Sequence, residues 1–334
     1  MRQTESVKQY AGVFIVIALL VLSSMIYRPG YFQRDLVYMM LRQAACLGIL
    51  SIGQMFVVAA GGTDLSVVAS MEISMVIIML FYSRLGGNWL GAGILTALIV
   101  CLGLGFINGT LITRFKVAPF ITTMFTGAIF AGVRRMFTGV SPMGSIPPSL
   151  AYFVKGEQAG EVPHAAYILL AVTVVGYIIL NKTVFGRKLV LVGSNPTAAE
   201  FSGIKVKQIR IITYCISAGV AVLAAIIIAG YTGYVDQETL AAGKGFDSLI
   251  AVVLGGNLLG GGKSTVIGTF GGALATTLIL NIVVLFGFQI QHQYVFKGLI
   301  LLAVVLFSAF ANSQSIKNIF NQKNPIVSDQ INPS

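Results

Sequence analysis

The sequence has few charged and few chemically reactive side chains. Of 334 residues, 10% are charged, and there are three cysteines, one tryptophan and only two histidines, His164 and His292. Neither histidine has a cysteine or an acidic residue at ligand spacing, and no G-x-S-x-G turn or H-E-x-x-H motif occurs. The cysteines all lie inside apolar runs, which is typical of buried small hydrophobes and not of a disulfide or zinc framework. We therefore expect no catalytic residues, no metal site and no cofactor.

Long apolar runs are what the sequence has in abundance. Hydrophobic residues make up 56% of the chain, and the mean hydropathy is +0.87. Such values are typical of a polytopic membrane protein. The formal net charge of +11 comes from basic residues that lie between the apolar runs, where they orient helices, so nucleic acid is not expected as a partner. The first apolar run lacks a signal-peptide cleavage site and is predicted to remain as a helix.

About ten runs are candidates for membrane spans of roughly 20 residues each. They lie near residues 11–27, 36–60, 65–82, 89–113, 117–137, 164–181, 209–231, 246–259, 265–286 and 294–311. Ten spans with both termini in the cytoplasm put most of the basic residues inside. The expected fold class is an all-α polytopic membrane protein with one domain, 1–334, embedded over about 11–311 and ending in a cytoplasmic tail at 312–334.

The order of the spans allows an internal repeat. A division into five plus five spans would give two halves of inverted topology, because each half has an odd number of crossings. GGTDLS at 61–66 and GKGFDS at 243–248 would then open spans on opposite sides of the membrane. Glycines four residues apart, as in Gly105 and Gly109 or Gly268 and Gly272, predict close packing between helices.

The stretch LGGNLLGGGKST at 254–265 looks like a phosphate-binding P-loop. The pattern G-x-x-x-x-G-K-[ST], aligned on Gly262 and Lys263, requires a glycine at position 257, where the chain has Asn257. Apolar runs flank the stretch on both sides, unlike the strand and helix that flank a P-loop. The sequence therefore predicts that this chain does not itself bind ATP.

Acidic residues near or inside the spans are functional candidates, because a charge in the membrane is costly. Asp64 follows two glycines and precedes an apolar run, which favours an N-cap at the positive end of a helix. Glu72 lies two turns further on, and three roles stay open for it: binding sugar hydroxyls, carrying a proton, or pairing with a basic group such as Arg42. The candidates for a translocation path or a helix cap are Gly61, Gly62, Asp64, Ser66 and Glu72.

The basic segment 182–208 is predicted to be a cytoplasmic loop. It contains a turn signal, then TAAEFSG, which predicts a short helix ended by a glycine C-cap. Ala199 and Gly203 are four residues apart, so we expect them to share a face of that helix with room for a docked partner. The candidate coupling residues are Arg187, Asn195, Pro196, Ala198, Ala199 and Gly203.

Three separated motifs together resemble the permease subunits of bacterial ribose-type ABC importers. They are GGTDLSVVAS at 61–70, VFGRKLVLVGSNPTAAEFSGIK at 184–205 and FDSLIAVVLGGNLLGGGKSTVIGTFGGAL at 246–274, in this order over almost the whole chain. The chain departs from the family pattern at Thr63, where isoleucine is usual, at Val68, where glycine is usual, and in the turn 261–264. These changes leave the solute undetermined, because such permeases serve pentoses, hexoses, polyols and related signals.

The resemblance implies a fold and a set of partners. The fold would be a type II importer permease in the bacterial inner membrane, paired with a second copy or a sister permease. Two ATP-binding domains would lie beneath it and a periplasmic or lipid-anchored solute-binding protein above it. The loop with Ala198, Ala199 and Gly203 would transmit closure of the ATPase, and ATP would be hydrolysed by the partner and not by this chain.

Two other functions fit the residues. A proton-coupled secondary transporter would use Asp64 and Glu72 as its proton carriers. A passive channel or structural membrane subunit is the third class. A true Walker A motif and a signal peptide in neighbouring reading frames would favour the importer over the symporter.

Overall fold

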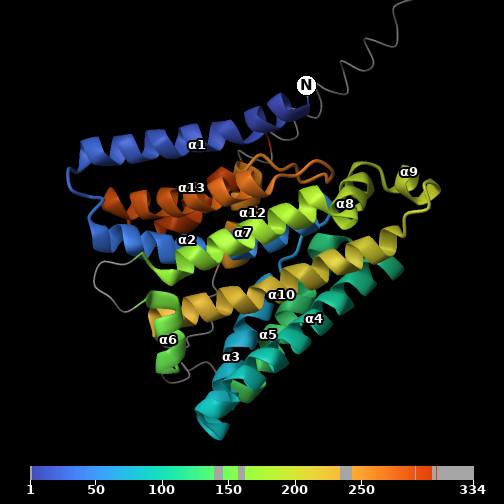
Figure 1. The fold of residues 1–334 in the computed structure, drawn as a ribbon, viewed down its shortest axis with the longest axis horizontal. Helices are drawn as coiled ribbons and strands as arrows, with labels where there is room; N and C mark the ends of the chain where they lie inside the picture. The colour runs from blue at the N-terminus through green and yellow to red at the C-terminus, as the bar shows by residue number, and fades with distance from the viewer. Residues whose placement is uncertain are drawn as a thin grey trace, which may run out of the picture.

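The computed structural model describes residues 2–138, 146–156, 162–233, 243–289, 291–302 and 306, and the side chains of 2–11 and 137 are left aside. Within these ranges the regular structure is helical, and it forms one bundle (Figure 1). The helices are α1 (Arg2–Tyr27), α2 (Arg34–Ala59), α3 (Val67–Leu85), η1 (Gly87–Trp89), α4 (Leu90–Arg114), α5 (Pro119–Thr138), α6 (Pro148–Lys155), α7 (His164–Lys182), α8 (Val184–Ser194), α9 (Pro196–Phe201), α10 (Val206–Thr232), α12 (Lys244–Leu254) and α13 (Val266–Leu285).

Helix α2 forms the centre of the bundle. Every residue from Ala44 to Ala59 is buried, so this helix has no solvent-facing or lipid-facing side along that stretch. A helix that is apolar all round has to be surrounded by other helices. Its neighbours are α10, α13, α7 and α12, while α1 lies outside α13 (Figure 1).

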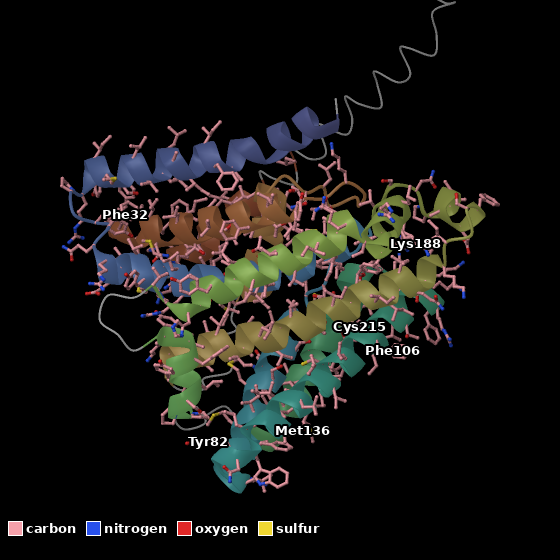
Figure 2. All side chains as sticks on the ribbon, viewed as in Figure 1. Phe32, Tyr82, Phe106, Met136, Lys188 and Cys215 are labelled. Carbon is pink, nitrogen blue, oxygen red and sulfur yellow. The ribbon has the colours of Figure 1, made fainter. Side chains whose placement is uncertain are left out.

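The outer surface is apolar, as a chain in lipid requires. Phe106 on α4 and Met136 on α5 are examples of large side chains that point away from the bundle (Figure 2). Among the described residues, six helices are both long and apolar enough to cross a membrane. These are the helices α2, α3, η1 with α4, α7, α10 and α13.

Two predicted elements differ from the structure. The predicted span at 246–259 corresponds to α12, which has eleven residues and so rises only about 16 Å, roughly half of the hydrocarbon thickness. The segment between the predicted spans at 117–137 and 164–181, for which no helix was predicted, contains helix α6 in its described part; α6 begins after Pro147 and buries Leu150 and Val154. The tail at 312–334 lies outside the described residues, and so does the last predicted span beyond residue 302, except for residue 306.

Close approach between helices explains the glycine pairs. A Cβ at Gly105 would lie 2.5 Å from the carbonyl oxygen of Tyr214, and one at Gly109 would lie 2.7 Å from the Cα of Ile211. These contacts bring the backbones of α4 and α10 together, which is the predicted use of small residues four apart. Gly268 lies equally close to the carbonyl group of Gly255, at the junction of α12 and α13.

Candidate functional site

The chain is non-helical between α2 and α3, and this break carries the acidic candidate Asp64. The carboxylate is 1% exposed, and its Oδ1 accepts hydrogen bonds from the backbone N–H of Ser66 at 3.0 Å and from the Ser66 hydroxyl at 2.5 Å. Ser66, and not Asp64, occupies the position directly before α3, but its dihedral angles (φ −73°, ψ −9°) are already helical. Asp64 thus bonds to the N–H two residues on, which is a capping contact at the start of this turn.

A chain of buried polar side chains extends from Ser66 to two further helices. Asn108 on α4 donates from Nδ2 to the Ser66 hydroxyl at 2.7 Å, and Thr126 on α5 donates from Oγ1 to Asn108 Oδ1 at 2.6 Å. Each bond is internal to the bundle, where an unpaired polar group would cost about 1–3 kcal/mol. The chain of bonds therefore fixes α4 and α5 relative to the break.

The backbone of the break is held by three more side chains. Thr123 accepts the N–H of Leu65 at 3.1 Å, and the hydroxyl of Tyr214 donates to the carbonyl of Thr63 at 3.3 Å. With its side-chain amide oriented so that each atom meets a suitable partner, Gln54 donates from its nitrogen to the carbonyl of Asp64 at 3.0 Å. Its oxygen accepts the N–H of Asp64 at 3.2 Å. Non-helical backbone at membrane depth is tolerated where protein groups satisfy it in this way.

Glu72 forms an ion pair with Arg134 of α5. The Arg134 Nε lies 3.1 Å from Glu72 Oε2, and both side chains are buried. The suggested partner Arg42 is therefore wrong: its guanidinium instead lies 5.9 Å from the ring centre of Tyr231. Two opposite charges in contact avoid the cost of a lone buried charge, so Glu72 and Arg134 join α3 to α5.

A cavity of about 310 Å³ lies beside this ion pair. Glu72 reaches its wall, and the other lining side chains are mostly apolar. They are Leu65, Val68, Met124, Gly127, Ala128, Ala131, Gly243, Gly245 and Phe246. Leu65 in the break thus lines the same cavity as Gly245 and Phe246 at the start of α12.

The break also meets the segment predicted to couple to a partner. Gly193 near the end of α8 packs against the carbonyl oxygen of Ala59 and the backbone nitrogen of Gly262, so closely that an added Cβ would overlap both. The N–H of Gly262 donates to the Ala59 carbonyl at 2.9 Å. A Cβ at Gly261 would lie 2.8 Å from the nitrogen of Gly61. We call Gly61, Gly193, Gly261 and Gly262 the glycine junction.

Asn257 holds the loop that imitates a P-loop. Its Nδ2 donates to the carbonyl of Val252 at 2.6 Å and to the hydroxyl of Thr269 at 2.9 Å, and its Oδ1 accepts the N–H of Thr265 at 2.7 Å. The residue that breaks the P-loop pattern therefore closes the turn between α12 and α13. The adjoining Gly261 and Gly262 allow close contact with other backbone segments at the glycine junction.

The predicted coupling residues fall on α8, α9 and the turn after α9. Asn195 caps α9 by accepting the N–H of Ala198 at 3.0 Å, and Pro196 occupies the first turn, where a missing N–H costs nothing. Arg187 is exposed on α8, at the same end of the bundle as the labelled Lys188 (Figure 2).

One expectation about α9 is wrong. Ala199 is only 4% exposed and faces the bundle, whereas Gly203 lies beyond the end of the helix with φ +76°. They do not share a helix face, because α9 stops at Phe201 after six residues. The exposed side chains of α9 are instead those of Thr197, Ala198, Glu200 and Phe201, and Phe201 is 89% exposed.

Several site residues were not singled out from the sequence. They are Gln54, Asn108, Thr126, Arg134 and Tyr214. The available signal was a polar residue inside an apolar span, which is a functional hypothesis by default. Among the described residues, no group of three or more histidine, cysteine or acidic side chains is close enough to hold a metal ion.

Comparison with known proteins gives a consistent result. Residues 36–305 match the model of a family described as "Branched-chain amino acid transport system / permease component". The ribose import permease protein RbsC of Bacillus subtilis (strain 168) is 32% identical over 312 residues, covering 90% of this chain and 93% of the relative. RbsC of Escherichia coli (strain K12) is 29% identical, covering 87% and 91% of the two chains.

A third relative is named for a different solute. The autoinducer 2 import system permease protein LsrC of Yersinia enterocolitica is 28% identical, covering 95% of this chain and 86% of the relative. No solved structure matches the chain. Because the family model spans most of the sequence and the relatives align over nearly their whole length, the chain belongs to this family of transport-system permease components.

Proposed function

We propose that the chain is the membrane permease subunit of an ABC importer for a ribose-like sugar or a related signal. The observation that carries this proposal is the end-to-end similarity to permeases named for ribose and autoinducer 2 import. The family model is described for branched-chain amino acids, but the relatives that match over nearly the whole chain are named for ribose import, autoinducer 2 import or ABC transport. ATP would be hydrolysed by a partner subunit, and a solute-binding protein would deliver the sugar.

The rival function is a proton-coupled symporter that uses Asp64 and Glu72. The contacts of both residues argue against it, because Glu72 is paired with Arg134 and Asp64 holds the turn before α3. A proton carrier has to lose its partners and reach water during transport. We therefore assign both acids to holding the bundle around the break, with the cavity beside Glu72 as the candidate stretch of the translocation path.

We propose that α9 is the docking point for the ATP-binding subunit. Phe201 is the exposed anchor, with Ala198 beside it, because a large apolar side chain that protrudes from a polar loop is typical of a buried interface centre. The glycine junction supports a coupling role, since movement of α8 would press directly on Ala59 and Gly262 next to the break. In this proposal, Asn195 and Pro196 contribute by fixing the residue at which α9 begins.

The topology is also a proposal. We infer ten crossings arranged as an inverted five-plus-five repeat, with both termini in the cytoplasm. The break before α3 and the start of α12 support the repeat, because each has an aspartate followed closely by a serine, at 64 and 66 and at 247 and 248. A cysteine at the exposed Thr197 should then react with an impermeant reagent only from the cytoplasmic side.

The importer proposal is tested by reconstitution. The chain would be placed in vesicles with the ATP-binding subunit and the solute-binding protein encoded next to it. Uptake of labelled ribose should require ATP and should survive a protonophore that collapses the proton gradient. Uptake that ignores ATP and stops with the protonophore would contradict the importer and support the symporter.

The docking surface is tested in the same system. Phe201→Asp should reduce co-purification of the ATP-binding subunit at equal expression of the permease, whereas Phe201→Leu should retain it. Equal recovery of the ATPase with both variants would contradict the assignment of α9.

A further inference from the structure

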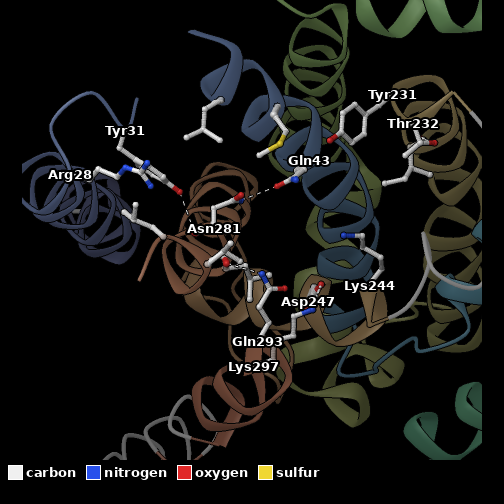
Figure 3. Close-up of a pocket in the computed structure, with 16 residues that line it drawn as sticks. Arg28, Tyr31, Gln43, Tyr231, Thr232, Lys244, Asp247, Asn281, Gln293 and Lys297 are labelled. Carbon is white, nitrogen blue, oxygen red and sulfur yellow. Dashed lines mark hydrogen bonds and ion pairs between the residues drawn. The ribbon is translucent and has the colours of Figure 1, made fainter. Parts of the chain in front are cut away.

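A cavity lined by apolar side chains and by a cluster of polar and charged groups lies at the end of the bundle away from α9. Its volume is about 530 Å³, and it is bounded where α1, α10 and α13 end and where α2 begins (Figure 3). Helices that cross a membrane end at the level of the lipid headgroups. The cavity thus sits at one membrane interface, at the opposite end from the segment that we propose docks the ATPase.

One wall of the cavity is a row of neutral hydrogen-bonding groups. The hydroxyl of Tyr31 donates to the carbonyl of Asn281 at 3.2 Å, and Asn281 Nδ2 donates to Gln43 Oε1 at 2.9 Å (Figure 3). Tyr31, Gln43 and Asn281 all line the cavity, and these bonds use neither the amide N–H groups of Gln43 nor the Oδ1 of Asn281. Burial raises the pKa of the Tyr31 phenol, against an opposing effect of Arg28, so the phenol stays a neutral donor.

The charged groups of the cavity favour an anion. Three basic residues line it, Arg28, Lys244 and Lys297, against the single acid Asp247. Asp247 is already paired with Lys297, whose Nζ lies 2.9 Å from Asp247 Oδ1. Lys244 is half-buried, points toward the cavity and makes no ion pair or hydrogen bond with any described residue (Figure 3). A half-buried ammonium group that faces a polar cavity is suited to bind a phosphate.

This cavity lies next to an apolar groove. A second cavity of about 460 Å³ shares Lys297 with the first and is lined by Phe246, Tyr294 and Leu301, between α12 and the segment 291–302. Phe246 and Tyr294 are exposed on the surface of the bundle. A cavity with basic and hydrogen-bonding groups in its wall, next to an apolar surface groove, fits a ligand with a charged head and a hydrocarbon chain. A small soluble anion would occupy the cavity and leave the groove empty.

We propose that this end of the bundle binds an anionic phospholipid with a hydroxylated headgroup. Lys244 and Lys297 face its phosphate, and Gln43 and Asn281 bond its headgroup hydroxyls. One acyl chain lies along the groove between Phe246 and Leu301. The site joins α2, α12 and α13 through one ligand and does not depend on which solute the chain carries.

The test uses the purified full-length chain in detergent. Its thermal unfolding would be followed with increasing fractions of phosphatidylglycerol, of phosphatidylcholine with the same acyl chains, and of glycerol 3-phosphate. Phosphatidylglycerol should raise the unfolding temperature at lower concentration than the other two. Equal effects of the two lipids, or an equal effect of glycerol 3-phosphate, would overturn the proposal without any variant.

A matched pair of variants locates the site. Lys244→Gln should raise the half-saturating fraction of phosphatidylglycerol about fivefold, the effect expected from one lost basic group near an anionic headgroup. Lys188→Gln removes an exposed basic group from α8 at the other end of the bundle and should leave the titration unchanged. A wild-type titration for Lys244→Gln, or an equal shift for both variants, would overturn the assignment to this cavity.

Discussion

Replacing Gly193 with alanine should disturb the contact between α8 and the break and leave the rest of the fold in place. The added Cβ would overlap the carbonyl oxygen of Ala59 and the nitrogen of Gly262, which are joined by a hydrogen bond of 2.9 Å. Overpacking of this kind costs about 1–3 kcal/mol, and the loss of the hydrogen bond adds about 1 kcal/mol. We therefore expect Gly193→Ala to destabilise the protein by roughly 2–4 kcal/mol relative to wild type.

Gly260 offers a control in the loop that meets Gly193. A Cβ at Gly260 would meet nothing within 4 Å, and this residue has no positive φ. Gly260→Ala should therefore change stability by less than about 0.5 kcal/mol, as is usual for an exposed position. The two variants add the same methyl group, so any difference between them comes from the packing around Gly193.

The assay measures thermal unfolding of both variants in detergent and ATP-dependent uptake in reconstituted vesicles. Gly193→Ala should unfold at a clearly lower temperature than Gly260→Ala. In vesicles held below that temperature, the complex that contains Gly193→Ala should take up less solute for each ATP hydrolysed by the partner subunit, because the glycine junction next to the break is displaced. Unfolding temperatures and uptake that match those of Gly260→Ala would refute the close backbone contact and the coupling role assigned to it.

Three further predictions test other parts of the site. Asp64→Asn should retain most transport, because an amide oxygen can accept both bonds from Ser66. Asp64→Ala should lose about 1 kcal/mol of local stability. Complete loss of transport in well-expressed Asp64→Asn would indicate a role for the charge itself. Arg134→Met should cost about 3–5 kcal/mol by leaving Glu72 buried without this partner, and adding Glu72→Met should recover most of it in the same unfolding assay; no recovery would show that the two are not coupled. The isolated chain should show no saturable ATP binding by calorimetry, and binding that Lys263→Ala abolishes would contradict this.

Much of the helix bundle could be predicted from the sequence because lipid imposes a simple rule. A span needs a long apolar run with its backbone bonded internally, so the runs at 36–60, 89–113 and 209–231 reappear as α2, α4 and α10. The run at 246–259 forms a helix of only eleven residues before the turn held by Asn257, because apolar composition does not fix where a helix ends.

The polar site could be predicted only in part. Asp64 and Glu72 stand out because a charge in an apolar run is rare, but the side chains that connect them to other helices are distant in sequence. Asn108 on α4 is 42 residues from Ser66, to which Asp64 bonds, and Arg134 on α5 is 62 residues from Glu72. Spacing along one helix gives no information about which side chains face each other from different helices. The inward orientation of Ala199 was missed for the same reason.

The sequence alone determined that this is a membrane-embedded helical permease, because apolar run length, basic loops and three motifs are all local properties of the chain. Tertiary structure decided what the glycines and buried polar residues do. The sequence does not distinguish Gly193 and Gly262 from other glycines, and their role follows only from the packing of α8 against Ala59. Likewise, Lys244 and Lys297 stand out among the basic residues only because the packed bundle places both of them at one cavity. Contacts of this kind join residues far apart in the chain, and only the packed bundle defines them.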